Sequence, residues 1–511
     1  MESTNRQHDP ARLREWLLAG VVALTIVLPA WDLGGARWKF AQLMLLCGAS
    51  LALVLALLPL PGPRSIRRPQ GSWRRVLTFA PLIPASLLLA QLITQNLNPA
   101  FDQVFTPRAL WPYEMVPRDD SEYLTWLPSG YTGIFSWYDG WRQVAILGSA
   151  FMLSLAIWTG LPRRRHLWFL LGVIALNAGA LGVLSLLQTL TEAEKILWLV
   201  PSPNPNFAAT FAYRGHGAVY LCLGAAAAVA VGLHSARHAR RRGLKSSPAP
   251  LWWLLAALAL VATFASGSRL GALFAALMSI ASVGLISLEI VRSGGFAIGL
   301  TLTLALLVLG ASWWQRERIA ALFSETTERF ESALEAHETG GIDGSLQNRL
   351  LTATVTLRMG EDRPWFGWGP GSFRYFFPRY QSQEPGLRGF ASVRSEYKSR
   401  MMPERLRLQF SQFYYAHSDP AQYLAEWGRV GFSLALAALL VPCAVMLLHA
   451  GGWSLEATSL ALGLHGVLAV SVLDLPLSNA AIFTLFTVVV TLLTRMVLLR
   501  HANRRTDSTT A

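Results

Sequence analysis

Charged side chains are scarce in this chain. Only 14% of its 511 residues are Asp, Glu, Lys or Arg, whereas 53% are hydrophobic. Soluble proteins carry roughly a quarter charged residues, so the composition argues against a string of soluble domains. Long apolar runs take the place of the missing charge, and runs of about 18 or more residues indicate membrane helices. We therefore expect an all-α polytopic membrane protein, because backbone groups inside a bilayer must be paired within the helix.

Cysteine is also scarce, and the motifs of several other site classes are missing. The three cysteines, Cys47, Cys222 and Cys443, all lie in apolar runs, so we expect no disulfide framework and no thiol metal site. No His-Glu-x-x-His motif is present, and the glycines in 367–371 lack the Lys-Ser/Thr ending of a phosphate loop. We expect neither a metal nor a cofactor. No small-residue cleavage site follows the first apolar run, so we expect no cleavable signal peptide.

About twelve apolar runs are long enough to cross a membrane. The predicted spans are 15–33, 39–61, 76–94, 142–161, 166–188, 216–234, 250–266, 270–292, 294–314, 421–449, 453–473 and 480–499. They divide the chain into three parts. Residues 1–314 hold spans one to nine, 315–420 form one large connection, and 421–511 hold spans ten to twelve with a tail.

The basic residues behind the net charge of +14 lie mostly in short connections, which argues against a nucleic-acid-binding surface. They cluster between spans two and three, four and five, and six and seven, and after span twelve. The positive-inside rule makes this side cytoplasmic, together with both termini. The long connections 95–141, 189–215 and 315–420 are then extracytoplasmic. The expected surroundings are membrane lipids, and no nucleic-acid partner is expected.

The largest connection contains two segments with helical spacing. Residues 319–338 carry apolar residues at helical intervals with charges between them, as an amphipathic helix on a membrane surface does. Residues 345–359 predict a second helix, which includes Arg349. A turn-rich stretch, 364–371, follows it.

Polar side chains gather at the predicted extracytoplasmic ends of the spans. They are Arg214 and His216 before span six, Arg269 between spans seven and eight, His417, Asp419 and Glu426 around the start of span ten, and Asp474 and Asn479 between spans eleven and twelve. An arginine at a membrane-embedded helix end is costly unless it is paired, which makes it a functional candidate. Two such arginines could clamp a diphosphate, because the guanidinium fork matches phosphate oxygens.

Each candidate also has a purely structural interpretation. Arg269 could be a snorkelling anchor, although such arginines favour the cytoplasmic side, and for Arg214 the two interpretations weigh equally. His417 is the candidate general base, with Asp419 or Glu426 as alternatives. His216 could transfer a proton or contact a ligand. His234, His449, His465 and His501 are interpreted as interfacial residues.

Five short segments together resemble the O-antigen ligase and polymerase family of bacterial envelope glycosyltransferases. They are TFAYRGH (210–216), SGSRLGA (266–272), DRPWFGWGPGSF (362–373) with PRY at 378–380, AHSDPAQYLAEWG (416–428) and DLPL (474–477). Each is weak alone, but all occur in order at the expected ends of the spans, over roughly residues 200–480. Tyr213 and Gly215 stand where the family often has asparagines, and Pro420 stands where it often has an aromatic residue.

The resemblance implies a GT-C-type fold and a glycan donor carried on undecaprenyl diphosphate. It implies transfer to lipid A-core, a growing glycan or a protein at the periplasmic face of the bacterial inner membrane, without a metal. With His417 as base, a single displacement would invert the anomeric configuration. The predicted catalytic residues are His417, Arg269 and Arg214, and the predicted substrate-binding residues are His216, Asp419, Glu426, Arg349 and Asp474.

Two other classes compete with a glycosyltransferase. A transporter should show Gly- or Pro-broken spans in two corresponding halves, with ionisable groups near the midplane. A structural subunit should not depend on any single arginine or histidine. The clustering of polar groups at one face favours catalysis there. Ligase and polymerase cannot be separated from the sequence, because they share the donor and differ in the acceptor.

Overall fold

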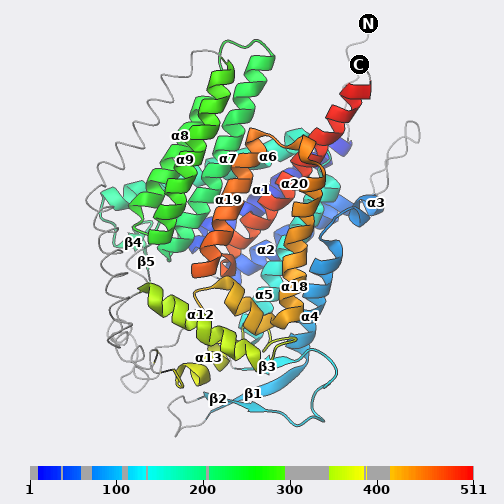
Figure 1. Ribbon diagram of the computed structural model, residues 1–511, viewed down its shortest axis with the longest axis vertical. Coiled ribbons are helices and arrows are strands. Elements are labelled where there is room, and N and C mark those ends of the chain that lie inside the picture. The colour runs from blue at the N-terminus through cyan, green and yellow to red at the C-terminus, as the bar shows by residue number, and fades with distance from the viewer. Residues whose placement is uncertain are drawn as a thin grey trace.

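The computed structural model describes residues 10–35, 38–58, 72–105, 113–133, 136–202, 207–293, 345–384, 387 and 415–509. Helices dominate these residues, with two small sheets (Figure 1). Among the described residues, nine helices are long and apolar enough to cross a membrane. The predicted class, an all-α polytopic membrane protein, is therefore confirmed.

Every predicted span except 294–314, which lies outside the described residues, coincides with a helix. These are α1 (Pro10–Trp31), α2 (Trp38–Leu57), α4 (Leu82–Leu97), α5 (Ser136–Gly160), α6 (Arg164–Leu190), α7 (Arg214–Arg241), α8 (Ala249–Ala265), α9 (Arg269–Ser293), α18 (Asp419–Leu448), α19 (Leu455–Leu473) and α20 (Ala480–Thr509). The helix of the third span is shorter than predicted. The first helix in this region, α3 (Ser72–Leu77), ends before Pro81, and the spanning helix α4 begins only after it. Three 3₁₀ turns, η1 (Leu33–Gly35), η3 (Ala450–Gly452) and η4 (Pro476–Ser478), join helices.

Helix α7 is the most enclosed of the long helices, and 94% of its most apolar stretch is buried. Small residues permit this, as at other helix crossings in membranes. A methyl group on Gly224 would lie 2.1 Å from Cβ of Ala178 in α6, and one on Gly463 of α19 would lie 2.7 Å from Cβ of Ala226. At the far end of α7, Arg237 pairs at 2.7 Å with Glu289 of α9 and with Glu456 of α19. Close packing and ion pairs therefore fix helix α7, which begins with Arg214, to its neighbours α6, α9 and α19.

A cap of strands and short helices covers one end of the bundle. We use this name for the described residues of 99–133 and 345–384. Strand β1 (Pro99–Phe105) pairs antiparallel with β2 (Tyr113–Pro117) and parallel with β3 (Gly130–Thr132). Helices α12 (Ser345–Glu361) and α13 (Phe373–Gln381) lie beside this sheet, opposite the end of the bundle where α20 terminates (Figure 1). A further hairpin, β4 (Lys195–Ile196) with β5 (Val200–Pro201), precedes α7.

The sequence predicted the cap in part. Helix α12 confirms the helix predicted at 345–359, whereas the amphipathic helix predicted at 319–338 lies outside the described residues. The strands were not predicted, because the connection 95–141 has no clear alternation of apolar residues. Aromatic side chains hold the cap together and join it to the start of α18: Tyr131, Trp368, Phe373, Phe376 and Phe377 are buried in one cluster with Ala416 and Ala425.

Helix α18 is broken at Gly428, which has a left-handed φ of 67°. The turn-rich loop 364–371 pairs with the backbone groups that the break frees. Trp368 and Gly369 donate their N–H groups to the carbonyls of Ala425 and Glu426, and Arg429 and Val430 donate theirs to the carbonyls of Pro364 and Trp365. This close approach of the two backbones explains why glycine is needed in the loop. A methyl group on Gly367 would lie 2.5 Å from the carbonyl carbon of Glu426.

Replacing Gly428 by alanine tests the pairing between the break in α18 and the loop 364–371. The new methyl group would lie 2.4 Å from the carbonyl oxygen of Trp365, at a φ that L-residues rarely adopt. We expect Gly428→Ala to cost at least about 2 kcal/mol of stability, seen as a lower melting temperature of the purified protein. The matched control is Gly284→Ala in α9, where a methyl group meets nothing within 4 Å. Equal melting temperatures for the two variants would contradict the account of the break.

Candidate functional site

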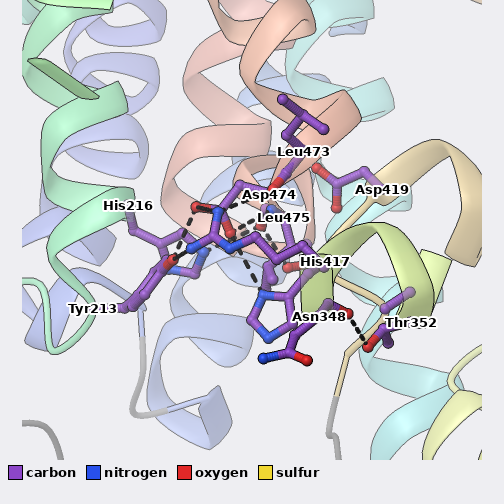
Figure 2. A network of polar contacts seen from close by, with 12 residues as sticks. Tyr213, His216, Asn348, Thr352, His417, Asp419, Leu473, Asp474 and Leu475 are labelled. Atoms are coloured by element: carbon purple, nitrogen blue, oxygen red, sulfur yellow. Dashed lines mark hydrogen bonds and ion pairs between the residues drawn. The ribbon is translucent and has the colours of Figure 1, made fainter. Parts of the chain in front are cut away.

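Asp474 lies between α19 and η4, at the centre of a polar network on the cap side of the bundle (Figure 2). It is only 3% exposed. Its Oδ2 accepts a hydrogen bond from the Tyr213 hydroxyl at 2.8 Å and lies 3.3 Å from Nη1 of Arg349. Its Oδ1 lies 3.9 Å from Nδ1 of His417. Burial alone would raise the pKa of Asp474, but contact with His417 and the charge of Arg349 lower it to about 2, so the group is a carboxylate at neutral pH.

Tyr213 links three elements through this carboxylate. Its hydroxyl donates to Asp474 and accepts a hydrogen bond from Nη2 of Arg349 at 3.1 Å. Burial and the neighbouring Asp474 raise the pKa of Tyr213, which keeps the phenol protonated as a donor. Arg349 also donates to the carbonyl of Leu473, the last residue of α19, at 2.9 Å. The start of α7, the cap helix α12 and the end of α19 are thereby fixed to one another.

His216 faces the same turn from α7, and both of its ring nitrogens have protein partners. Nε2 lies 3.1 Å from the carbonyl oxygen of Leu475, which can only accept, so we assign the ring proton to Nε2. Nδ1 then accepts from the amide of Asn479 at 3.4 Å. The same amide donates to the carbonyl of Gly34 in η1 at 2.8 Å. This arrangement positions the turn that carries Asp474 and leaves no ring nitrogen available for proton transfer.

His417 has a left-handed backbone, with a φ of 54°. This conformation is uncommon for a residue other than glycine and is often found at functional sites. The next residue, Ser418, caps α18 by accepting a hydrogen bond from the N–H of Ala421. The side chain of His417 is 28% exposed. The imidazole is therefore placed beside the Asp474 carboxylate and remains accessible to a substrate.

Arg214 and Arg269 are the first residues of α7 and α9. The turn before α9 depends on Gly267, with a φ of 66°, and on Ser268, whose hydroxyl accepts from the N–H of Gly271 at 3.2 Å. Nη1 of Arg214 lies beside this turn, 3.4 Å from the position of a methyl group on Gly267. Among the described residues, Arg269 and Arg349 are charged neighbours of Arg214. Because helix N-termini also carry positive partial charge, this face suits a polyanion.

The two carboxylates nearest to His417 in sequence form hydrogen bonds with other parts of the protein. Asp419 is 1% exposed, and its Oδ2 accepts from the N–H of Leu477 at 2.8 Å. Glu426 is fully buried and accepts hydrogen bonds from the N–H groups of Gly371 and Phe373 and from the amide of Gln422. Gly371 and Phe373 belong to the cap, Gln422 to α18 and Leu477 to η4. The carboxylate beside the His417 imidazole is Asp474, 57 positions further along the chain.

The sequence-predicted residues thus fall into two groups. The structure brings His417, Arg349, His216 and Asp474 together and sets Arg214 beside Arg269 and Arg349. Asp419 touches the network through its backbone, since its N–H donates to the carbonyl of Asp474 at 3.2 Å. In the part of the chain that the structure describes, Glu426 forms its hydrogen bonds with Gln143, Gly371, Phe373 and Gln422, outside this network. Tyr213 was missed, because it appeared only as a departure from the family pattern.

Fold and site together define a polytopic membrane protein with a cationic, histidine-containing site at converging helix ends. Within the described ranges, no three His, Cys, Asp or Glu side chains gather closely enough to hold a metal ion. Residues 254–436 match the family model described as O-antigen ligase, which confirms the predicted family resemblance. The matched segment includes Arg269, Arg349 and His417, whereas Arg214 and Asp474 lie outside it. A search of curated proteins gave no match.

Removing the Tyr213 hydroxyl tests the network. Tyr213→Phe deletes one hydrogen bond to a buried carboxylate and one from Arg349, and such bonds to charged groups contribute about 1.5–3 kcal/mol each. We expect glycan transfer to fall about tenfold or more while the protein remains folded. Tyr123→Phe is the control, because Tyr123 makes an exposed hydrogen bond to Asp120 outside the site. Unchanged activity of Tyr213→Phe in a purified transfer assay would show that the network is not needed.

Proposed function

We propose that this O-antigen ligase-like enzyme transfers a glycan from undecaprenyl diphosphate to an acceptor hydroxyl at the periplasmic face of the bacterial inner membrane. The family match supports an enzyme of this general kind. The undecaprenyl diphosphate donor is what the resemblance to the family implies, whereas the chemistry is inferred from the site. The observation that supports this chemistry most directly is the His417 imidazole beside the buried Asp474 carboxylate, in a network that also holds the cation Arg349.

His417 acts as the general base. Its imidazole takes the proton from the acceptor hydroxyl while that oxygen forms a bond to the anomeric carbon of the donor sugar. The bond between the anomeric carbon and the diphosphate oxygen breaks, and the bonding electrons leave with undecaprenyl diphosphate. Attack opposite the leaving group inverts the configuration. A positioned base contributes about 10²–10⁴-fold in rate, and the Asp474 carboxylate stabilises the imidazolium that forms.

Arg214 and Arg269 bind the diphosphate and stabilise the negative charge that develops as it leaves. A diphosphate is a good leaving group, so cations at helix N-termini suffice without a general acid. Arg349 is ion-paired with Asp474, and its principal role in this scheme is to hold that carboxylate. His216 holds the turn, and Asp419 and Glu426 support the backbone around the site.

The structure gives less support to a transporter. A transporter is expected to have broken helices in corresponding halves around a midplane site. The break in α18 is instead paired with the cap loop, and the candidate site lies where helices end.

Lipid A-core is the proposed acceptor, with a growing glycan as the polymerase alternative. Lipopolysaccharide from a deletion strain tests this assignment. Loss of all long glycan from the core supports a ligase, whereas a core that retains one repeat unit supports a polymerase and contradicts the ligase assignment.

Arg269→Lys tests the diphosphate contact. Lysine keeps the charge but loses the planar fork, so we expect a strong decrease in transfer, about 10- to 100-fold, corresponding to about 1.5–3 kcal/mol. Arg358→Lys is the control, because Arg358 lies on α12 and forms an exposed ion pair with Glu384, away from the site. Near-normal transfer by Arg269→Ala, with the protein present at its normal level, would remove Arg269 from the site.

A further inference from the structure

Two arginines lie close together towards the end of the bundle away from the cap. Arg495 belongs to α20, inside the apolar run 480–499, and Arg75 belongs to the short helix α3. The two are charged neighbours of each other. An arginine inside a membrane span is costly unless it is paired, and it is therefore a candidate for a functional site. The sequence did not single out this pair, because basic residues are expected towards this side of the membrane.

Trp158, near the end of α5, connects the two arginines. The guanidinium carbon of Arg495 lies 5.0 Å from the centre of the Trp158 ring, within the range of a cation–π contact. Arg75 donates from Nη1 to the carbonyl of the following residue, Thr159, at 3.2 Å. The Trp158 indole donates to the Thr78 hydroxyl, beyond the end of α3, at 3.1 Å. Trp158 is only 5% exposed, so packing fixes the positions of these groups.

Among the described residues, neither arginine forms an ion pair. Both side chains are half-buried, and Nε of Arg495 is buried without a hydrogen-bond partner. The described carboxylates towards this end pair with other arginines: Glu15, Glu289 and Glu456. A half-buried guanidinium with only neutral partners is costly, and an anionic ligand would offset that cost. The pair of arginines therefore has the charge to bind a phosphate group.

The two arginines also lie beside one end of an apolar groove between α4, α5, α18 and α20. The groove has a cavity volume of about 280 Å³, and Trp158 and Thr494 line the end beside the arginines. Asp419 lines the other end, near the candidate site. Thr494 is 14 positions beyond Ala480, the first residue of α20, which corresponds to roughly 20 Å at 1.5 Å per residue. A phosphate bound by the arginines is therefore remote from the candidate site.

We propose that Arg75 and Arg495 bind the phosphate of an anionic glycerophospholipid from the membrane leaflet away from the cap. One acyl chain of this lipid enters the neighbouring end of the groove. The assignment of that leaflet to the cytoplasmic side rests on the proposed function, and basic pockets between helices on this side are suited to anionic lipids. A lipid-linked diphosphate whose sugar reaches His417 lies too far along α20 to place its phosphates here. The bound phospholipid would hold α3 against α5 and α20.

Native mass spectrometry tests this site without a transfer assay. The protein is released from nanodiscs that contain phosphatidylglycerol, phosphatidylcholine and undecaprenyl phosphate in both leaflets, so the result does not depend on orientation. The wild type should retain phosphatidylglycerol in preference to phosphatidylcholine. Arg495→Gln and Arg75→Gln should each weaken this retention about tenfold, because a hydrogen bond to a charged phosphate is lost. Arg242→Gln is the matched control, because it removes an exposed cation that follows α7 at the same end of the bundle.

Four results would each overturn the proposal. They are equal retention of the two phospholipids by the wild type, wild-type retention by Arg495→Gln or Arg75→Gln, an equal loss in Arg242→Gln, and a selective loss of undecaprenyl phosphate. The third would indicate general attraction to a basic surface, and the fourth a site for the polyprenyl lipid. Melting temperatures in phosphatidylcholine equal to that of the wild type establish that the variants are folded. Retained phosphatidylglycerol without any glycan transfer would contradict the proposed function and leave this site supported.

Discussion

The buried carboxylate of Asp474 is the interaction on which the candidate site depends. One side chain fixes Tyr213 before α7, Arg349 on α12 and His417 before α18. A buried anion is stable only when it is paired and hydrogen-bonded, so these groups stabilise Asp474 as much as it positions them. Loss of one partner would leave uncompensated charge, and its effect would extend to all three elements.

The cap and the bundle are joined by backbone pairing rather than by hydrophobic contact alone. The break at Gly428 exposes polar groups that would be costly in a membrane, and the loop 364–371 pairs with four of them. Glu426 accepts further N–H groups from the same loop. This joint sets the position of the first turns of α18, and hence of His417 relative to Asp474. A rigid scaffold of this kind is what a preorganised catalytic site requires.

The sequence allowed most of the helices to be predicted, because the thickness of the bilayer sets the length of an apolar run. It also selected Arg214 and Arg269, because the positive-inside rule makes arginines on the other face unusual. It could not pair Tyr213 with Asp474, since contacts between distant segments leave no local pattern. The roles of Glu426 and of the loop glycines could not be predicted either. Both support the break of α18 at Gly428, and this break depends on tertiary packing.

The central claim is that His417 is the base, and the pH dependence of glycan transfer by the purified His417→Gln variant tests it most directly. Glutamine keeps hydrogen bonding without basicity. The account predicts a loss of about 10²–10⁴-fold and the disappearance of the acidic limb that a general base gives to the pH profile of the wild type. His465→Gln, on the exposed side of α19, should behave like the wild type. Full activity of His417→Gln with an unchanged pH profile would contradict the account.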